Sequence, residues 1–155
     1  MISYFCQLMR DQEIYQKIGE LLWSIMMEDA ETIICEGYIY PEFNSYSFEW
    51  VTKKNQIGWF DMDEIPHEIG QKIIILMSEL RSLDIFKEKW TNFKVTLSDT
   101  GKFNIEFAYI PEEDHWPSLS MRGISDLSEE ELDRDYSQIP KELWKERVRI
   151  KNQNK

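Results

Sequence analysis

The stretch from Trp90 to Tyr109 constrains the fold more than any other part of the chain. Phe93, Val95 and Leu97 alternate with polar residues, and after a break at residues 98–101 the same alternation resumes from Phe103 to Tyr109. A period of two is typical of a strand with one buried face, so the stretch predicts a β-hairpin. The other face carries side chains suited to water or a partner, with no arrangement that would perform chemistry: Lys94, Thr96, Lys102, Asn104 and Glu106.

Three further strands are predicted upstream, over Thr32–Tyr40, Tyr46–Lys53 and Ile57–Met62. The breaks between them, residues 41–45 and 54–56, are rich in turn-forming residue types. Loops this short cannot make a parallel crossover, so the three strands are expected to form an antiparallel meander.

Two long segments have helical spacing instead. From Asp11, which we expect to cap the first helix, apolar residues recur every three or four positions, and the first ten residues have no readable period. A second helix is predicted from Pro66 to about Lys87, because proline is well tolerated in the first turn. The apolar residues whose spacing predicts the first helix are Ile14, Ile18, Leu21, Leu22, Ile25 and Met26. Those of the second helix are Ile69, Ile73, Leu76, Met77, Leu80 and Leu83.

Near the C-terminus, Ser128-Glu-Glu-Glu131 fits a capping box that opens a short helix. Another short helix is predicted from Pro140 through Arg149, with Leu143, Trp144 and Val148 facing inward.

This order of elements predicts an α+β fold: a single antiparallel sheet of about five strands with helices packed mainly on one face. We expect one domain over residues 1–155, with residues 1–10 as an N-terminal extension and residues 111–155 as an acidic loop followed by short C-terminal helices.

The charge balance is strongly acidic and bears on the kind of partner. Asp and Glu outnumber Lys and Arg by 29 to 18, which gives a formal net charge of -11. Such a field repels phosphate backbones, so direct nucleic-acid binding is not expected, and it attracts a basic protein. Between Pro111 and Asp135, nine acidic residues accompany only Arg122 and Arg134.

Cysteine content and hydropathy favour a cytoplasmic protein. Cys6 and Cys35 match no disulfide framework or zinc-type spacing, so we expect reduced, packed thiols. The N-terminus lacks the features of a signal peptide, and no run of about 18 apolar residues suggests a membrane span.

No catalytic residue, metal site or cofactor is predicted. His67 and His115 have no Ser or Cys in a recognised nucleophile setting, and we interpret them as surface or capping residues. The contiguous residues 112–115 are unsuited to converge on one cation, the acids at 61–64 lack the EF-hand pattern, and no phosphate-binding glycine loop exists. A carboxylate pair that forms only in three dimensions stays open.

The aromatic residues have two readings. Those that follow strand alternation, such as Trp50 and Phe93, indicate core. Trp59, Trp116 and Tyr136 are less regular and stand beside acids. They fit either a protein-binding surface with aromatic residues and a charged rim, or ordinary packing.

One family shares these motifs. The pattern Trp90-Thr91-x-Phe93, followed by Gly101-Lys102-Phe103-x-Ile105-x-Phe107-x-Tyr109, resembles the YezG-like immunity proteins of bacterial polymorphic or contact-dependent toxin systems. The Ile65-Pro66 dipeptide and the Ile14-Tyr15-x-x-Ile18 helix are similar to that family too, and the likeness covers about residues 11 to 110. The first ten residues and the stretch Met26-Met-Glu-Asp-Ala30 depart from the family's pattern.

The resemblance implies a cytoplasmic antitoxin, not an enzyme, that binds and neutralises the toxin domain of a delivered effector, commonly a nuclease. Nucleases are often basic because they bind phosphate, and a carboxylate-rich face can pair with the same cationic groups. The candidate partner-binding residues lie in two loops: Asp61, Asp63, Glu64, Glu112, Glu113, Asp114 and Trp116.

Two other functions remain as alternatives. An acidic secretion chaperone or adaptor would bind a protein partner without inhibiting it, and a small hydrolase would use the loop of carboxylates around His115. The toxin's substrate, the affinity and the oligomeric state stay open at this point.

Overall fold

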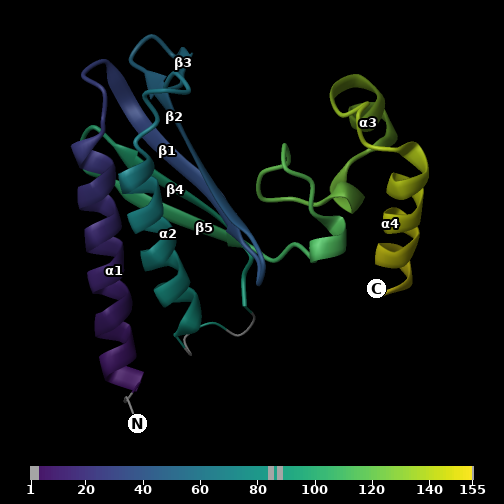
Figure 1. The fold of residues 1–155 in the computed structure, drawn as a ribbon, viewed down its shortest axis with the longest axis horizontal. Coiled ribbons are helices and arrows are strands. Elements are labelled where there is room, and N and C mark those ends of the chain that lie inside the picture. Colours follow the sequence, from purple (N-terminus) through teal and green to yellow (C-terminus); the bar gives the residue numbers. More distant parts are fainter. Residues whose placement is uncertain (1–3, 84–85, 87–88, 155) are drawn as a thin grey trace. The chain divides into compact units, whose positions relative to one another are not determined.

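The structure is a computed structural model that describes residues 4–83, 86 and 89–154. The chain divides into two compact units, Met1–Tyr109 and Ile110–Lys155. The first contains two long helices and the sheet, and the second contains two short α-helices and two 3₁₀ turns (Figure 1). The prediction of one domain over residues 1–155 stays a prediction, and each unit is described by itself.

Five antiparallel strands form the sheet of the first unit in the order β3-β2-β1-β4-β5. This confirms the predicted α+β class with a single antiparallel sheet. The strands are β1 (Ala30–Ile39), β2 (Asn44–Thr52), β3 (Ile57–Gly58), β4 (Asn92–Ser98) and β5 (Phe103–Ala108).

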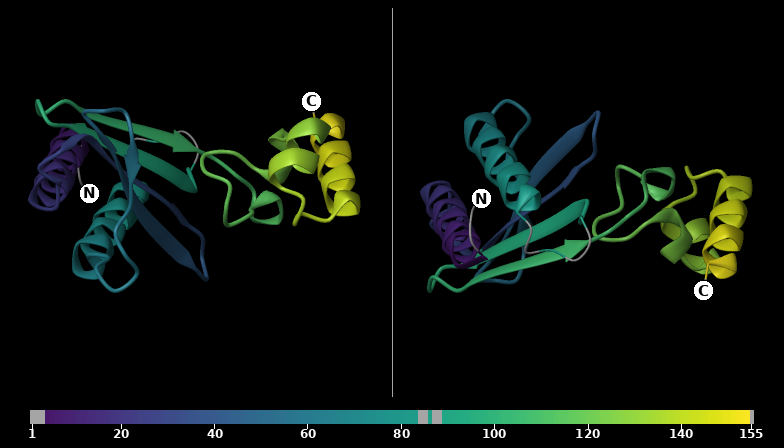
Figure 2. Two further views of the ribbon diagram at one scale, coloured as in Figure 1. Left: turned by 90° about the horizontal axis from the view of Figure 1, so that it is seen from above. Right: turned by 90° about the horizontal axis from the view of Figure 1, so that it is seen from below.

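Strand alternation gives the sheet one apolar face. Cys35 on β1 lies opposite Phe48 on β2 and Val95 on β4, and Val95 in turn lies opposite Ile105 on β5. Helices α1 (Tyr4–Ser24) and α2 (His67–Ser82) both cover this face (Figure 2). Their apolar stripes pack on it, with Ile14, Ile18 and Leu22 from α1 and Ile73, Met77 and Leu80 from α2.

Cys35 lies at the centre of this core. Its thiol is free and fully buried, as predicted, and burial raises its pKa. The side chain of Cys6 lies outside what the structure describes.

Several predicted element boundaries differ from the structure. Helix α1 begins at Tyr4 instead of Asp11, and Asp11 does not cap it, because this residue continues the inward stripe and is only 6% exposed. Helix α2 ends at Ser82, where Leu83 takes an extended conformation; the predicted end at Lys87 lies outside the described residues. Strand β3 stops at Gly58 instead of Met62.

The second unit has an apolar cluster of its own. It contains η1 (Glu112–Asp114), η2 (Ile124–Asp126), α3 (Glu129–Asp135) and α4 (Lys141–Gln153). Leu143 and Trp144 pack against the cluster as predicted, while Val148 is half-buried. The buried members of the cluster are Leu119, Ile124, Leu127, Leu132 and Ile139.

The capping box at Ser128 is confirmed. The Glu131 backbone N–H donates to Ser128 Oγ at 3.1 Å, and the Ser128 N–H donates to Glu131 Oε1 at 3.2 Å. Two backbone donors at the start of α3 are thereby satisfied, which explains why so short a helix forms.

The contact between α2 and β2 generates a test of the core. A Cβ added at Gly70 would lie 2.1 Å from the Tyr46 ring, so Gly70→Ala must displace that ring. We expect the free energy of unfolding to fall by roughly 1–3 kcal/mol from overpacking, which outweighs the gain of at most about 1 kcal/mol in helix propensity. Urea unfolding followed by tryptophan fluorescence measures the change.

Gly19 on α1 offers a matched control. A Cβ there would meet Phe103 at 3.6 Å, which is ordinary contact, so Gly19→Ala should leave stability unchanged or raise it. Equal losses from the two variants would contradict the explanation.

Candidate protein-binding surfaces

Residues 57–66 of the first unit connect β3 to α2 and direct apolar side chains in opposite directions. Phe60 turns inward, where its ring lies edge-on to Trp50 at a centroid distance of 4.9 Å and an angle of 70°. Its neighbour Trp59 is 65% exposed. Gly58 permits this arrangement, because a Cβ there would lie 2.3 Å from the Trp50 indole nitrogen.

The turn after Phe60 combines exposed apolar and acidic side chains. The Glu64 N–H donates to the Asp61 carbonyl at 2.8 Å, which closes the turn. The side chain of Met62, within this turn, is 90% exposed. Asp61, Asp63 and Glu64 are exposed and form no side-chain hydrogen bond or ion pair with any residue that the structure describes. We call residues 57–64 the acidic-aromatic segment; it also exposes Ile57.

A hollow of about 460 Å³ lies beside this segment. Tyr46 Oη and His67 Nδ1 are 2.6 Å apart and share a hydrogen bond at its rim, and burial raises the pKa of Tyr46. His67 thus joins the start of α2 to β2, which agrees with a structural role. The hollow is lined by Asn44, Ser45, Tyr46, Ser47, Phe48, Trp59, Phe60, Ile65 and His67.

In the second unit, the loop at 112–116 differs from the prediction in one respect. Glu112 and Glu113 are exposed, but Asp114 is only 3% exposed. Its carboxylate accepts from the Ser125 N–H at 3.0 Å and the Ser125 hydroxyl at 2.7 Å, and it pairs with Arg147 at 3.2 Å. Asp114 therefore links parts of this unit to one another, and its carboxylate is buried within the unit.

Most other acids of the second unit are paired as well. Arg122 binds Glu131 at 2.8 Å and lowers the pKa of that carboxyl group. Burial opposes ionisation of Asp126, but hydrogen bonds from Lys151 and the Gly123 N–H outweigh this and lower its pKa. Helix α4 supplies further cations, since Lys141 pairs with both Glu129 and Asp133. The acidity of residues 111–135 is thus largely neutralised within the unit.

The predicted site residues accordingly fall into groups with different surroundings. Asp61, Asp63 and Glu64 form one exposed group in the first unit, Glu112 and Glu113 are exposed in the second, and Trp116 is half-buried against the apolar cluster of that unit. Sequence reasoning missed Ile57 and Met62, although strand alternation at residues 57–60 already indicated that one side of this segment is exposed.

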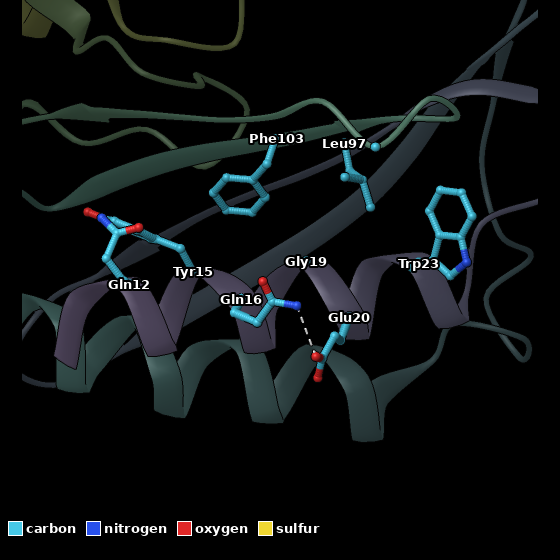
Figure 3. Close-up of a pocket in the computed structure, with 9 residues that line it drawn as sticks. Gln12, Tyr15, Gln16, Gly19, Glu20, Trp23, Leu97 and Phe103 are labelled. Atoms are coloured by element: carbon cyan, nitrogen blue, oxygen red, sulfur yellow. Dashed lines mark hydrogen bonds between the residues drawn. The ribbon is translucent and has the colours of Figure 1, made fainter. Parts of the chain in front are cut away.

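A second hollow of about 530 Å³ lies between α1 and the end of the β4–β5 hairpin (Figure 3). Phe103 and Leu97 face the flank of α1, where Gln16 donates to Glu20 at 3.1 Å. We call this hollow the α1–β5 groove; it is lined by Gln12, Tyr15, Gln16, Gly19, Glu20, Trp23, Leu97, Gly101 and Phe103.

No hydrogen bond joins a Ser, Thr or Cys to a His among the residues that line either hollow; the hydroxyl–imidazole pair at the rim of the first, Tyr46 with His67, links β2 to the start of α2. Within residues 4–83, 86 and 89–154, no group of three or more His, Cys, Asp or Glu side chains could hold a metal ion. Burial lowers the pKa of His115, which lies after η1 in the second unit. That the chain works without catalysis stays a prediction.

None of the helices in the described part of the chain is both long and apolar enough to span a bilayer.

A comparison with known protein families identifies the family of this chain. A family model described as "Immunity protein YezG-like" matches residues 12–124, which is well over half of the chain. The chain belongs to the YezG-like immunity protein family. The matched range spans the sheet, most of α1 and all of α2, and it extends beyond the likeness seen in the sequence as far as η2. A comparison with curated proteins finds no match.

Membership in the YezG-like family confirms the resemblance stated from the hairpin and helix motifs. It suggests an immunity function for the chain and implies a toxin as its partner. The acidic-aromatic segment and the loop at 112–116 both lie inside the matched range.

The burial of Asp114 generates a test in the second unit. In Asp114→Asn, the Arg147 guanidinium loses its anionic partner, and we expect a loss of roughly 1–3 kcal/mol in the stability of this unit. Hydrogen exchange followed by mass spectrometry should show faster exchange in residues 110–155 and no change in the sheet. Glu113→Gln is the control, because this neighbouring carboxylate is exposed, and a similar acceleration there would contradict the assignment.

Proposed function

We propose that the chain is a cytoplasmic antitoxin that binds a cognate toxin domain, a nuclease, in a stoichiometric complex and neutralises it by occlusion. The supporting observation is a set of carboxylates that pair with no described residue and lie beside exposed apolar side chains, in a chain that belongs to an immunity protein family. Binding of this kind needs no catalytic group.

The distribution of charge supports a basic partner for the first unit. Residues 1–109 hold 18 of the 29 acidic residues but only 10 of the 18 Lys and Arg residues. The second unit is nearer to balance, with 11 acids and 8 bases, and pairs most of its acids internally. The first unit is therefore the main source of the field that steers a cationic protein.

The acidic-aromatic segment combines the two components of a protein interface. Trp59 and Met62 offer large apolar area for a partner to cover, and Asp61, Asp63 and Glu64 surround them with charge. Aromatic residues near the centre of an interface usually contribute most of its binding energy, while charged rims govern the association rate. We propose this segment as the primary toxin-binding surface, with Glu112, Glu113 and Trp116 as further candidates.

A nuclease fits this surface because the groups with which nucleases bind the phosphates of nucleic acid are cationic and can pair with carboxylates. An inhibitor that presents carboxylates competes for the same groups and covers the substrate groove with its bulk. Acidity in the first unit then contributes to inhibition as well as to solubility.

The proposal is tested by co-expressing the chain with the toxin domain encoded by the adjacent reading frame. Survival together with a one-to-one complex is the expected outcome. Cell death although both proteins are soluble would refute neutralisation, and a stable complex without protection would favour the adaptor alternative.

A charge-reversal variant tests the surface. Asp61→Lys combined with Asp63→Lys should slow association with the toxin domain by about tenfold at low salt, because steering is lost, with a smaller effect at high salt. Stopped-flow or surface plasmon resonance measures the rate. Glu28→Lys combined with Glu31→Lys changes the net charge equally at two exposed positions elsewhere and serves as the control; equal slowing by both variants would contradict a localised surface.

A truncation tests the aromatic component. Trp59→Ala should weaken the complex by about thirtyfold or more, since an interface aromatic that is fully covered contributes roughly 2 kcal/mol or more. Isothermal titration calorimetry measures the affinity. Trp23→Ala removes an exposed tryptophan from α1 and is the matched control.

A further inference from the structure

Strand β5 leaves one long edge of the sheet without a partner strand among the described residues. The order β3-β2-β1-β4-β5 places it at one end, and it runs over Phe103–Ala108 with no proline. The opposite edge is β3, which is only two residues long. Short edge strands are one way in which proteins prevent sheets from joining, and β5 lacks this protection.

The hydrogen bonds of β4 identify which backbone groups of β5 face outward. The Ile39 N–H donates to the Thr91 carbonyl and the Asp99 N–H to the Glu31 carbonyl, both at 2.8 Å, so the odd-numbered residues of β4 bond to β1. The even-numbered residues therefore bond to β5, as the Ser98 N–H does to the Lys102 carbonyl at 2.9 Å.

In the β4–β5 register, Lys94 lies opposite Glu106 and Thr96 opposite Asn104. The even-numbered residues of β5 thus point their backbone groups at β4, and those of Phe103, Ile105 and Phe107 point to the free edge. No hydrogen bond to these three outward N–H and C=O pairs is found among the described residues. The edge can accept another strand over this length.

The side chains along the edge suit such an addition. Phe103, Ile105 and Phe107 point to the helix-covered face and are only half-buried, so an added strand would bury them further. Beside Phe103 lies the α1–β5 groove, with the flank of α1 as its other wall (Figure 3). A strand on this edge would place alternate side chains into the groove.

The exposed face of β5 is complementary to itself in one register. Consider two copies that pair antiparallel with Phe103 opposite Ile105 of the second copy. Lys102 then lies opposite Glu106 of the second copy, and by the twofold symmetry Glu106 lies opposite Lys102 of the second copy. A shift of two residues in either direction puts Lys102 opposite Asn104 or Ala108 instead. Lys102 and Glu106 are both exposed and form no ion pair with any described residue, so both are available.

We propose that the chain forms a twofold symmetric homodimer through β5, which joins two five-stranded sheets into one. The interface combines backbone hydrogen bonds between Phe103 and Ile105 of the two copies with two Lys102–Glu106 pairs. Opposite charges directly across an antiparallel pair stabilise it, and like charges destabilise it. This inference does not depend on the proposed toxin-binding function.

Sedimentation equilibrium across a concentration series tests the dimer with four proteins: the wild type, Lys102→Glu, Glu106→Lys and the double variant. Each single variant places like charges opposite each other twice per dimer and should raise the dissociation constant by about tenfold or more. The double variant restores both pairs and should restore the wild-type constant. Lys102→Glu is the more informative single change, because Glu106→Lys also faces Lys94 within the chain.

Amide exchange followed by NMR provides a second, residue-specific measurement. The outward N–H groups of Phe103 and Ile105 should exchange slowly in the dimer and rapidly in Lys102→Glu, while the Glu106 N–H, which faces β4, stays protected in both. Circular dichroism melting confirms that the variants fold.

Three results would overturn the proposal. The first is a wild type that stays monomeric at every concentration. The second is a dimer whose dissociation constant is the same in all four proteins. The third is a monomer whose Ile105 amide becomes protected only when the toxin domain is added, which would assign the edge to a strand of the toxin.

Discussion

The first unit depends on the packing of α1 and α2 against one face of an antiparallel sheet. Because side chains alternate along each strand, a single register places Ile33, Cys35, Val95 and Phe93 on the same side, where the two helices bury them. The arrangement leaves several places for exposed features: the outer face of the sheet, its two edges, the outer sides of the helices, and the connection from β3 to α2. The acidic-aromatic segment occupies that connection, held by Phe60 on Trp50.

The second unit is stabilised in another way, with a small apolar cluster and a set of ion pairs. Asp114, Ser125 and Arg147 bring together η1, η2 and α4, and Gly123 is required beside them because a Cβ would lie 2.1 Å from the Asp114 carboxylate. The acidic residues that the sequence analysis placed together as candidate partner-binding residues, in two loops, thus have two physical roles. Those of the first unit at 61–64 are free to interact, whereas those of the second largely satisfy local cations.

The elements predicted correctly are those with strong local signals. The hairpin follows from alternation around a turn, and the capping box at Ser128 from four consecutive residues. The failures involve distant contacts. The burial of Asp114 depends on Arg147, which is 33 positions away, and the inward position of Phe60, just after the end of β3, depends on its contact with Trp50 on another strand. The start of α1 was missed because Asp11 resembles a helix cap, although Tyr4, Phe5, Leu8 and Met9 upstream already have helical spacing. The self-complementary register of β5 becomes readable only once the strand order is known.

Cys35 gives the first unit a built-in reporter of its own opening. Its sulfur is enclosed by the sheet and both helices, and its raised pKa keeps it protonated at neutral pH. Electrophiles and oxidants therefore cannot modify it while the helices remain docked. Modification of Cys35 requires the helices to separate from the sheet. The rate of modification therefore reports how often the core opens transiently to solvent.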